Sequence, residues 1–435
     1  MDAAEHDRPL RIALLSYRSK PHCGGQGVYV RHLSRELVAL GHDVEVLSGP
    51  PYPELDTLPD GRAPRLTRVP SLDLYREDDP FRVPHWREFR GPVDVAEFLL
   101  MCTAAFPEPL TFSLRAWRLL RRRPAGERPD VVHDNQTLGY GLLLLQRDGF
   151  PVLPTVHHPI TVDRVHDLDA AVGLRKRLAT HRWYSFLRMQ GRVVRRLPAV
   201  LTVSESSAVD IARDFEVPAE RLTVVPVGVE TDVFLPPELR GAPPRVPGRI
   251  VATASADVPI KGVVPLLEAV AKLRTERDVE LVVVGRPREG GLVARTIERL
   301  DLSASVRFVH GLSEAELVDV FGSAQVAVVP SLYEGFSLPA VEAMACGTPL
   351  VASAAGALPE VVGPDGETAL HVPPGDPEAL AAAVGRLLDD DDLRTRIGAA
   401  GRARVVERYT WRAVAEATVR WYRTSLPARK EDVPC

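Results

Sequence analysis

The chain alternates short apolar runs with amphipathic stretches along its length. The run at 10–16 is short and apolar, which is typical of a strand buried on both faces. A glycine-containing loop at 23–27 separates it from a helical pattern that ends at Gly41, and a further apolar run at 42–48 completes a β-loop-α-β unit. The other elements expected in the first half are strands at 130–133, 151–158, 199–204 and 221–229 and a helical stretch over 172–197.

After a proline-rich segment the same alternation begins again. Residues 235–248 hold five prolines, which neither a helix interior nor a central strand tolerates, so we expect them to link two domains. Beyond them we expect strands at 249–255, 279–285, 306–311, 327–331 and 349–353, and helices at 263–275, 291–300, 313–323, 338–346, 377–389, 392–407 and 411–424. This pattern predicts an α/β fold of two Rossmann-like, doubly wound parallel-sheet domains facing a central cleft.

Composition and charge remove several classes of function. The 435 residues are 45% hydrophobic and 26% charged, which fits a globular protein and excludes a disordered chain. The net charge of −4 makes nucleic acid an unexpected partner. Four scattered cysteines without a CxxC spacing indicate reduced thiols and a cytoplasmic location, and the acidic N-terminus is not a signal peptide. No apolar stretch reaches the roughly 20 residues of a membrane-spanning helix.

The most informative stretch is PSLYEGFSLPAVEAMACG at 330–347. A strand enters it and a helix leaves it, with Ser337 suited to the N-cap and Pro339 tolerated in the first helical turn. Backbone N–H groups of the residues before the helix would then point out of its N-terminus, as in an anion site that suits a diphosphate. The residues expected to contribute them are Gly335, Phe336, Ser337 and Leu338.

Two carboxylates flank this expected phosphate site. Glu334 comes just before the helix, and Glu342 lies more than a turn further along it. Carboxylates in these places can accept hydrogen bonds from polyhydroxyl groups, one from a sugar ring and the other from a ribose. The alternative is a solvated helix that carries two surface glutamates.

EGFSLPAVE resembles the E-x7-E signature of the retaining glycosyltransferases of family 4, which have the GT-B fold. The resemblance extends over nearly the whole chain, through GGQGVYVRHLSRELVALGHDVEVLS near the start and KGVVPLLEAV, CGTPLVAS and ETALHVPPGD later. It implies an acceptor-side domain at 1–234, a linker at 235–248 and a domain at 249–410 that binds the nucleotide-sugar donor. The last helix, about 411–425, resembles the family helix that crosses back onto the first domain.

The resemblance also implies roles for individual residues. Lys261 followed by Gly262 matches the lysine that binds the donor diphosphate, and His157 matches a histidine near the donor sugar. The glycine loop matches at Gly24 and Gly25, which let backbone amides approach phosphate, and Gln26 would bind phosphate or acceptor. The chain departs from the family at 255–257, where an arginine of the diphosphate site is usual and none is present.

Three further residues are placed on the acceptor side by their position after the expected strands. His133 and Asn135 end one strand, and His158 follows His157 at the end of the next. Neighbouring side chains on a strand point to opposite faces, so we expect one of the two adjacent histidines to face the cleft. Three histidines could suggest a metal site, but carboxylates nearby are few and the resembled family is metal-independent, so we expect neither metal nor cofactor.

The implied function is transfer of a hexosyl-type sugar from a nucleotide-diphosphate sugar to an acceptor hydroxyl, with retention of configuration. His157, Lys261 and Glu334 are the expected catalytic residues, and the leaving diphosphate itself takes the acceptor proton. An inactive nucleotide-sugar-binding subunit is the alternative, whereas a nicotinamide dehydrogenase is disfavoured because the first loop lacks GxGxxG. The base, sugar, acceptor and oligomeric state stay open.

The segment 172–197 is strongly basic, with eight arginines and lysines and no acidic residue. Aromatic and aliphatic residues recur in it at helical spacing, as in a basic amphipathic helix that lies on an anionic membrane. Two other interpretations are a surface for an anionic acceptor and a solvated arginine face. The first would make the protein peripheral on the inner face of the membrane.

Overall fold

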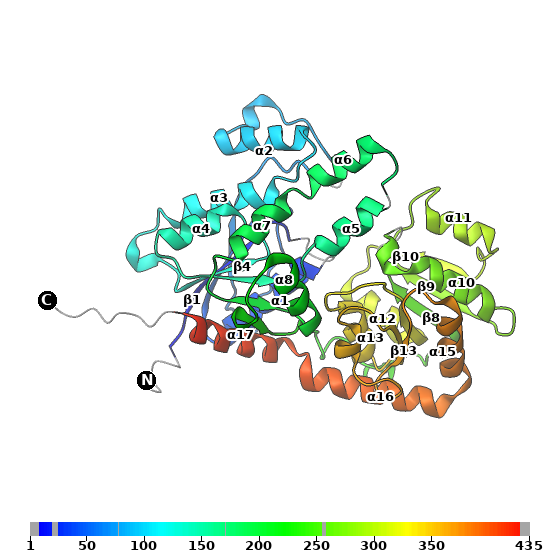
Figure 1. The fold of residues 1–435 in the computed structure, drawn as a ribbon. Helices are drawn as coiled ribbons and strands as arrows, with labels where there is room; N and C mark the ends of the chain where they lie inside the picture. The colour runs from blue at the N-terminus through cyan, green and yellow to red at the C-terminus, as the bar shows by residue number, and fades with distance from the viewer. Residues whose placement is uncertain (1–7, 20–24, 77, 170, 255–257, 427–435) are drawn as a thin grey trace. The chain divides into compact units, whose positions relative to one another are not determined.

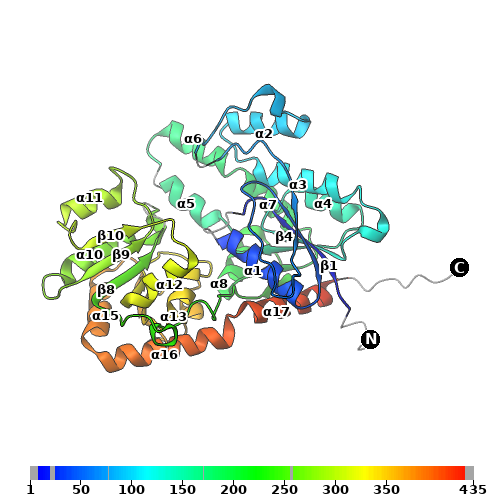
Figure 2. The ribbon, with the colours of Figure 1, turned by 180° about the vertical axis from the view of Figure 1, so that it is seen from behind.

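The computed structural model describes residues 8–19, 25–76, 78–169, 171–254 and 258–426. Contacts within the chain divide it into two compact units. Unit 1 comprises Met1–Val203, Ala208–Val225 and Val414–Cys435, and unit 2 comprises Ser204–Ser207 and Pro226–Ala413. Figures 1 and 2 show helices packed around the sheet of each unit.

The described part of unit 1 holds a seven-stranded parallel sheet in the order β3-β2-β1-β4-β5-β6-β7. Its strands are β1 Arg11–Ser16, β2 Asp43–Ser48, β3 Arg65–Arg68, β4 Val131–Asn135, β5 Val152–Val156, β6 Val200–Thr202 and β7 Leu222–Val224. Chain order reverses between β1 and β4, so the carboxyl ends of these two strands form the switch point where doubly wound folds bind ligands.

Helices cover both faces of this sheet. They are α1 Gly25–Ala39, α2 Pro92–Cys102, α3 Glu108–Leu120, α4 Tyr140–Arg147, α5 Thr161–Asp169, α6 Leu174–Trp183, α7 Phe186–Val194, most of α8 Glu205–Phe215 and most of α17 Trp411–Ser425. The 3₁₀ turns are η1 Trp86–Glu88, η2 Ala125–Glu127 and η3 Ala219–Arg221. β4 and β5 are buried along their full length, although β4 ends in the polar residues His133, Asp134 and Asn135.

The single helix expected over 172–197 is wrong, because α6 and α7 are separate. Tyr184 and Ser185 break it, and the Tyr184 hydroxyl donates to Asp167 on α5 at 2.7 Å. α7 turns its apolar residues into the core, where Val193 and Val194 are fully buried. Residues 172–179 are all exposed, and α6 packs only through its C-terminal end, where Thr180 is buried and Trp183 contacts Phe106. The helical spacing of the apolar residues therefore reflects packing by α7 and the end of α6, and it does not extend to residues 172–179.

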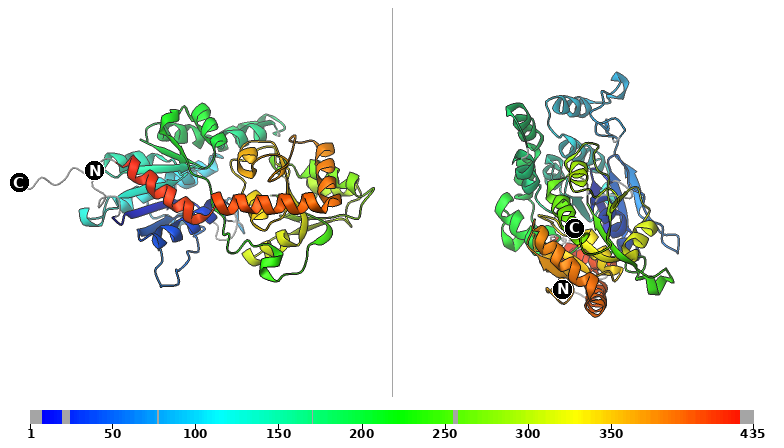
Figure 3. Two further views of the ribbon diagram at one scale, coloured as in Figure 1. Left: turned by 90° about the horizontal axis from the view of Figure 1, so that it is seen from below. Right: turned by 90° about the vertical axis from the view of Figure 1, so that its right-hand side faces the viewer.

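The described part of unit 2 repeats the same design with six parallel strands in the order β10-β9-β8-β11-β12-β13. They are β8 Val246–Thr253, β9 Glu280–Val284, β10 Val306–Val309, β11 Ala324–Val329, β12 Leu350–Ser353 and β13 Leu370–Val372. The helices are α9 Pro237–Arg240, η4 Pro259–Lys261, α10 Val263–Leu273, α11 Leu292–Arg299, α12 Glu314–Ser323, α13 Leu338–Ala345, α14 Leu358–Val362, α15 Pro377–Asp389 and α16 Asp391–Arg408. α16 packs along α13 and β12, and it is the long orange helix in the left view of Figure 3. The switch point lies between β8 and β11.

Part of the proline-rich segment 235–248 forms regular structure, which was not expected. Pro237 occupies the first position of α9, where a missing N–H costs little, and Gly241 ends this short helix with φ +62°. β8 already begins at Val246. The contact boundary falls after Val225 instead of after residue 234, and the final helix returns to unit 1 at Val414. The central cleft stays a prediction.

Candidate active site

The switch point of unit 2 brings a lysine and a glutamate together. Lys261 ends η4 after β8, and Glu334 follows β11, the neighbouring strand. The Lys261 Nζ donates to Glu334 Oε1 at 2.8 Å, and the Ser331 hydroxyl donates to the same oxygen at 2.7 Å. The Lys261 side chain is 30% exposed and that of Glu334 is 12% exposed, so a partly desolvated cation faces the edge where ligands bind. Two predicted site residues 73 positions apart form one ion pair.

Two glycines fix the backbone around this pair. Gly262 has φ +64°, and a Cβ there would lie 1.9 Å from the carbonyl oxygen of Pro330, so the predicted glycine is required by geometry. Gly356 has φ +55°, and a Cβ there would lie 2.4 Å from the Glu334 carbonyl oxygen. The next amide, Ala357 N–H, donates to that carbonyl at 2.9 Å. Gly356 supports Glu334 and was not predicted, because nothing local in the sequence connects the two.

The N-terminus of α13 lies next to Glu334. Ser337 precedes the helix but does not cap it through its side chain, so the predicted cap is wrong. Its backbone is left-handed at φ +90°, whereas capping serines are extended. The Gly335 carbonyl accepts from the hydroxyls of Ser204 at 2.7 Å and Ser207 at 3.2 Å, which fixes the turn that leads to Leu338 and the first helical turn. Amides of a first turn lack helical partners, so this end of α13 suits an anion.

Phe336 and Glu342 complete the unit 2 candidates. The Phe336 ring is buried edge-on against Tyr409, with ring centroids 5.6 Å apart, so only its backbone is placed to bind a ligand. Glu342 is half-buried on α13, and burial together with the charge of Glu314 raises its pKa to about 7. Such a carboxyl both donates and accepts hydrogen bonds near neutral pH, which suits a hydroxyl partner.

In unit 1 three predicted residues meet at the carboxyl ends of the central strands. His157 Nε2 and Asn135 Oδ1 are 2.7 Å apart, and Asn135 Nδ2 donates to the Gln26 carbonyl oxygen at 3.4 Å. The His157 ring packs edge-on against Tyr29, with centroids 4.8 Å apart. Burial and the neighbouring His158 lower the pKa of His157 to about 3, so the imidazole is neutral. Gly25 begins α1 beside this group, whereas Gly24 lies outside the described residues.

His133 does not face an acceptor, which corrects its predicted role. It is fully buried, with Nδ1 hydrogen bonded to the Tyr422 hydroxyl and Nε2 to the Thr155 hydroxyl. Burial lowers its pKa to about 3. A neutral ring with both nitrogens occupied ties β4 to β5 and α17, so His133 has a structural role.

His158 and an unpredicted residue, Gln136, shape the same edge. His158 Nε2 lies 3.3 Å from Asp163 Oδ2 on α5, so it contacts its own unit. The Gln136 side chain bridges the backbone at the end of β5, because its Oε1 accepts from His157 N–H and its Nε2 donates to the His158 carbonyl, both at 2.7 Å. The backbone of Gln136 is left-handed at φ +54°. A polar residue directly after a buried strand was the available signal for it.

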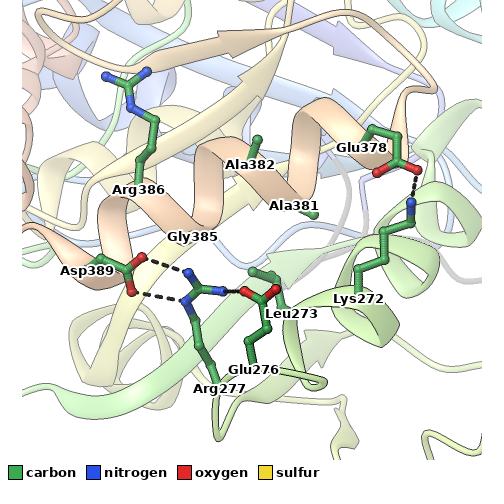
Figure 4. Close-up of a pocket in the computed structure, with 10 residues that line it drawn as sticks. All are labelled: Lys272, Leu273, Glu276, Arg277, Glu378, Ala381, Ala382, Gly385, Arg386 and Asp389. Atoms are coloured by element: carbon green, nitrogen blue, oxygen red, sulfur yellow. Dashed lines mark hydrogen bonds and ion pairs between the residues drawn. The ribbon is translucent and has the colours of Figure 1, made fainter.

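Unit 2 also has a groove, which lies apart from the candidate residues. This groove of about 350 Å³ runs between α10 and α15, and none of the candidate residues lines it (Figure 4). Most of its charged residues form ion pairs, Lys272 with Glu378 and Arg277 with both Glu276 and Asp389. Within the described ranges, no group of three or more histidine, cysteine or acidic residues could hold a metal ion, and no helix has both the length and the apolar character needed to span a membrane.

Comparison with known proteins supplies the family. The profile described as "Glycosyl transferases group 1" matches residues 240–404, and that described as "Glycosyltransferase Family 4" matches 23–233. A protein of Mycolicibacterium hassiacum named "MMP alpha-(1->4)-mannosyltransferase" is 57% identical over 421 residues, 96% of this chain and 98% of the relative. The chain belongs to the group 1 glycosyltransferases. This confirms the predicted family and the predicted glycosyltransferase activity.

More distant relatives and solved structures agree with this assignment. A Catenulispora acidiphila protein named "D-inositol 3-phosphate glycosyltransferase 2" is 30% identical over 96% of each chain. The structure of sucrose-phosphate synthase from Thermosynechococcus elongatus superimposes with a TM-score of 0.70 at 26% identity, covering 95% of this glycosyltransferase and 98% of that chain. Anabaena HepE in complex with UDP-glucose gives 0.67 at 17% identity, covering 96% and 100%. The predicted GT-B fold is confirmed.

Proposed function

We propose that this glycosyltransferase is an α-(1→4)-mannosyltransferase that takes mannose from a nucleoside diphosphate mannose. The observation that carries the proposal is the Lys261–Glu334 pair at the switch point of unit 2, next to the N-terminus of α13. The choice of mannose and of the α-(1→4) bond is supported by the relative at 57% identity, whose name states both. By the same likeness, we propose that the acceptor is the MMP of that name, and we take it to be an α-(1→4)-linked mannoside, the class of product that each transfer through this bond would leave.

The donor would bind through unit 2. An ammonium group has three N–H donors, and Lys261 spends one on Glu334, so two can reach diphosphate oxygens. The amides of 335–338 would bind the same diphosphate. Because Lys261 and Ser331 both donate to Oε1 of Glu334, its Oε2 is the oxygen for a mannose hydroxyl. Glu342 would hold the ribose.

The reaction we propose retains the donor configuration. The bond from the anomeric carbon to the diphosphate oxygen breaks, and a bond to the acceptor oxygen forms on the same face of the sugar. The acceptor proton passes to the leaving diphosphate, so no carboxylate nucleophile is required. The protein contributes positioning and stabilisation of the developing negative charge by Lys261 and the α13 amides.

Unit 1 would supply the acceptor side. Asn135 Oδ1 facing His157 Nε2 favours the tautomer with the proton on Nε2, which leaves Nδ1 as an acceptor of a sugar hydroxyl. Because the pKa of His157 is lowered to about 3, the ring stays neutral across the working range of an enzyme. Gln136 and Asn135 would position this ring, and Gln26 would contact phosphate or acceptor.

We also propose that the reaction needs no metal, because Lys261 and backbone amides supply positive charge at the diphosphate. A chelator should leave the rate unchanged. A large loss with EDTA that a divalent ion restores would contradict this. An inactive subunit is not favoured, since the relative with 57% identity over nearly the full length is named as a transferase.

We also propose contact with an anionic membrane through residues 172–179, which include the start of α6. Residues 172–179 are exposed, and they combine Arg175, Lys176 and Arg177 with apolar Val172 and Leu174. This is the composition of a peripheral membrane-binding segment. The competing interpretation is that these cations bind an anionic acceptor, such as the inositol 3-phosphate in the names of the more distant relatives.

The test is a substrate matrix with purified protein. UDP-, GDP- and ADP-mannose are each offered with an α-(1→4)-linked mannose disaccharide or with inositol 3-phosphate, and released nucleoside diphosphate is measured. We expect release with one mannose donor and the disaccharide, and none in the Glu334→Ala variant. Full activity of that variant would overturn the site, and activity with inositol 3-phosphate alone would overturn the acceptor.

A further inference from the structure

The loop 78–90 of unit 1 presents large apolar side chains to solvent. Phe81 is 58% exposed, Val83 79% and Trp86 70%. Single exposed apolar residues are ordinary on protein surfaces, but a group of them on one loop marks a contact surface. Two of the three are aromatic, which are the residue types that dominate binding surfaces.

The loop is held in one conformation by its own polar contacts. Arg82 donates to both carboxylate oxygens of Glu88, at 2.7 and 2.9 Å, and to the Leu72 carbonyl oxygen at 2.7 Å. His85 N–H donates to Glu88 Oε1 at 2.7 Å and closes a capping box on η1. The exposed rings are therefore displayed by an ordered loop, and a ligand would meet a preformed surface.

Phe81 also has an unfavourable backbone. Its φ is +64°, a left-handed conformation that is an outlier for a bulky aromatic residue. Glycine or asparagine would relieve the strain and would not place a ring in water. Strained conformations are retained mainly at functional positions.

An aromatic chain links this loop to the ligand-binding edge of the sheet. The Phe81 centroid lies 5.5 Å from that of Tyr75 and 6.3 Å from that of Trp183. Trp183 lies 5.0 Å from Phe106, and Phe106 lies 6.3 Å from Tyr17, the residue after β1. α2 and α6, which flank the loop, project at the same end of unit 1 in Figures 1 and 2. The chain of rings thus joins Phe81 to Tyr17, which follows β1 at the same edge of the sheet where His157 follows β5.

We propose that Phe81 and Trp86 bind sugar units of the acceptor chain that lie away from the reacting hydroxyl. The proposal rests on the proposed function, in which the acceptor is a mannoside. A pyranose has a face of C–H groups, which the electron-rich face of an aromatic ring attracts, and a rim of hydroxyls. Arg87 lies over the Trp86 ring at 5.1 Å, so the guanidinium and the ring together offer a polar and an apolar partner.

The charge of the loop favours a neutral glycan over a lipid surface. Residues 78–90 contain three acidic residues and three arginines, so the loop itself has no net charge. The cations proposed for an anionic leaflet lie on the neighbouring α6, and charge reversal on α6 tests that surface separately from the loop variants. An uncharged glycan, which has both apolar C–H faces and hydroxyl groups, is the ligand that suits the aromatic rings of this loop and its balanced charges. A lipid surface or a second copy of the chain remains as an outcome of the test.

The experiment compares acceptors of different length. α-(1→4)-linked mannose disaccharide and octasaccharide are used as acceptors, and we expect KM to be about tenfold lower for the octasaccharide. Trp86→Ala and Phe81→Asn should raise the octasaccharide KM to the disaccharide value and leave kcat and the disaccharide KM unchanged. Phe81→Asn keeps the left-handed backbone, so its melting temperature should not fall. Leu239→Ala, at an apolar residue 66% exposed in unit 2, is the matched control and should behave as the wild type.

Direct binding separates this inference from the proposed function. Octasaccharide is titrated into the protein without donor by isothermal titration calorimetry, a measurement that does not depend on the replaced tryptophan. Binding that Trp86→Ala abolishes supports the surface even if mannose transfer is never observed. Wild-type protein that does not bind, or variants that keep the wild-type octasaccharide KM, overturn it. Loss of a dimer in sedimentation, or loss of binding to anionic vesicles, as the sole effect of Trp86→Ala would also overturn it.

Discussion

Replacing Gly262 with alanine tests whether the backbone beside Lys261 is as constrained as the structure indicates. A left-handed alanine costs about 1–2 kcal/mol in conformational energy. The added Cβ would also lie 1.9 Å from the Pro330 carbonyl oxygen and 2.8 Å from its carbon, so backbone must move. Overpacking of this kind costs about 1–3 kcal/mol more. Gly290 is a matched control, because its φ of +65° is nearly the same and nothing lies within 4 Å of its Cβ position.

Two measurements follow for the Gly262→Ala and Gly290→Ala variants. In a unit of this size, 1 kcal/mol shifts the melting temperature by roughly 2–4 °C, so Gly262→Ala should melt about 3–10 °C below Gly290→Ala. A backbone shift near Lys261 disturbs its 2.8 Å contact with Glu334, and displacements of about 1 Å at a reacting site cost on the order of 100-fold. We therefore expect kcat/KM for the mannose donor to fall about 100-fold in Gly262→Ala and to stay at the wild-type value in Gly290→Ala.

The comparison has a clear negative outcome. If both alanine variants lose the same stability and both keep full donor kcat/KM, the close approach of Gly262 to Pro330 does not position Lys261. The donor site would then have to be sought elsewhere in unit 2.

Three further predictions concern titration, structure and surface. The pKa of Glu342 is raised to about 7, so between about pH 4.5 and 7 the folded state holds a proton that the unfolded state releases. Glu342→Gln should therefore have the wild-type melting temperature near pH 4.5 and be roughly 2–3 kcal/mol more stable than the wild type above pH 7. Equal melting temperatures at both pH values would contradict the burial of this carboxyl. His133→Phe removes the hydrogen bonds to Tyr422 and Thr155 and should lower the melting temperature. The acceptor KM should not change at a temperature where the variant is folded. A change in acceptor KM without a change in melting temperature would restore the predicted acceptor role of His133. Replacing Arg175, Lys176 and Arg177 of α6 with glutamate should abolish salt-sensitive binding to anionic vesicles without changing donor affinity. Wild-type protein that does not bind such vesicles at low salt would contradict the membrane proposal.

The elements closest to the candidate site could be predicted from the sequence because they carry strong local signals. A short apolar strand followed by glycines predicted the loop that holds Gln26, and the resemblance at Lys261 and Gly262 indicated the loop after β8. The strand-to-helix motif predicted Glu334 and Glu342 on either side of an anion site. The resemblance supplied the roles, and structure supplied the direct contact of Lys261 with Glu334.

What could not be predicted depends on residues distant in sequence. Gly356 is needed only because Glu334 lies against it, and Gln136 matters only because β5 ends beside it. The break between α6 and α7 follows from the core that α7 enters, since the same basic composition runs through both helices. From the sequence, His133 and Asn135 have the same predicted acceptor role, because both end the same strand. His133 instead has a structural role, because it is fully buried and hydrogen bonded to Tyr422 on the final helix.

The most direct test of the central claim is a proton NMR time course of the purified enzyme with its mannose donor and the α-(1→4)-linked disaccharide. Retaining transfer predicts that the first new anomeric signal belongs to an α-linked mannose and grows as the nucleoside diphosphate mannose disappears. The Glu334→Ala variant should leave the donor unchanged, because the mannose contact beside the diphosphate is lost. A β-linked first product, or undiminished transfer by the variant, would contradict the account.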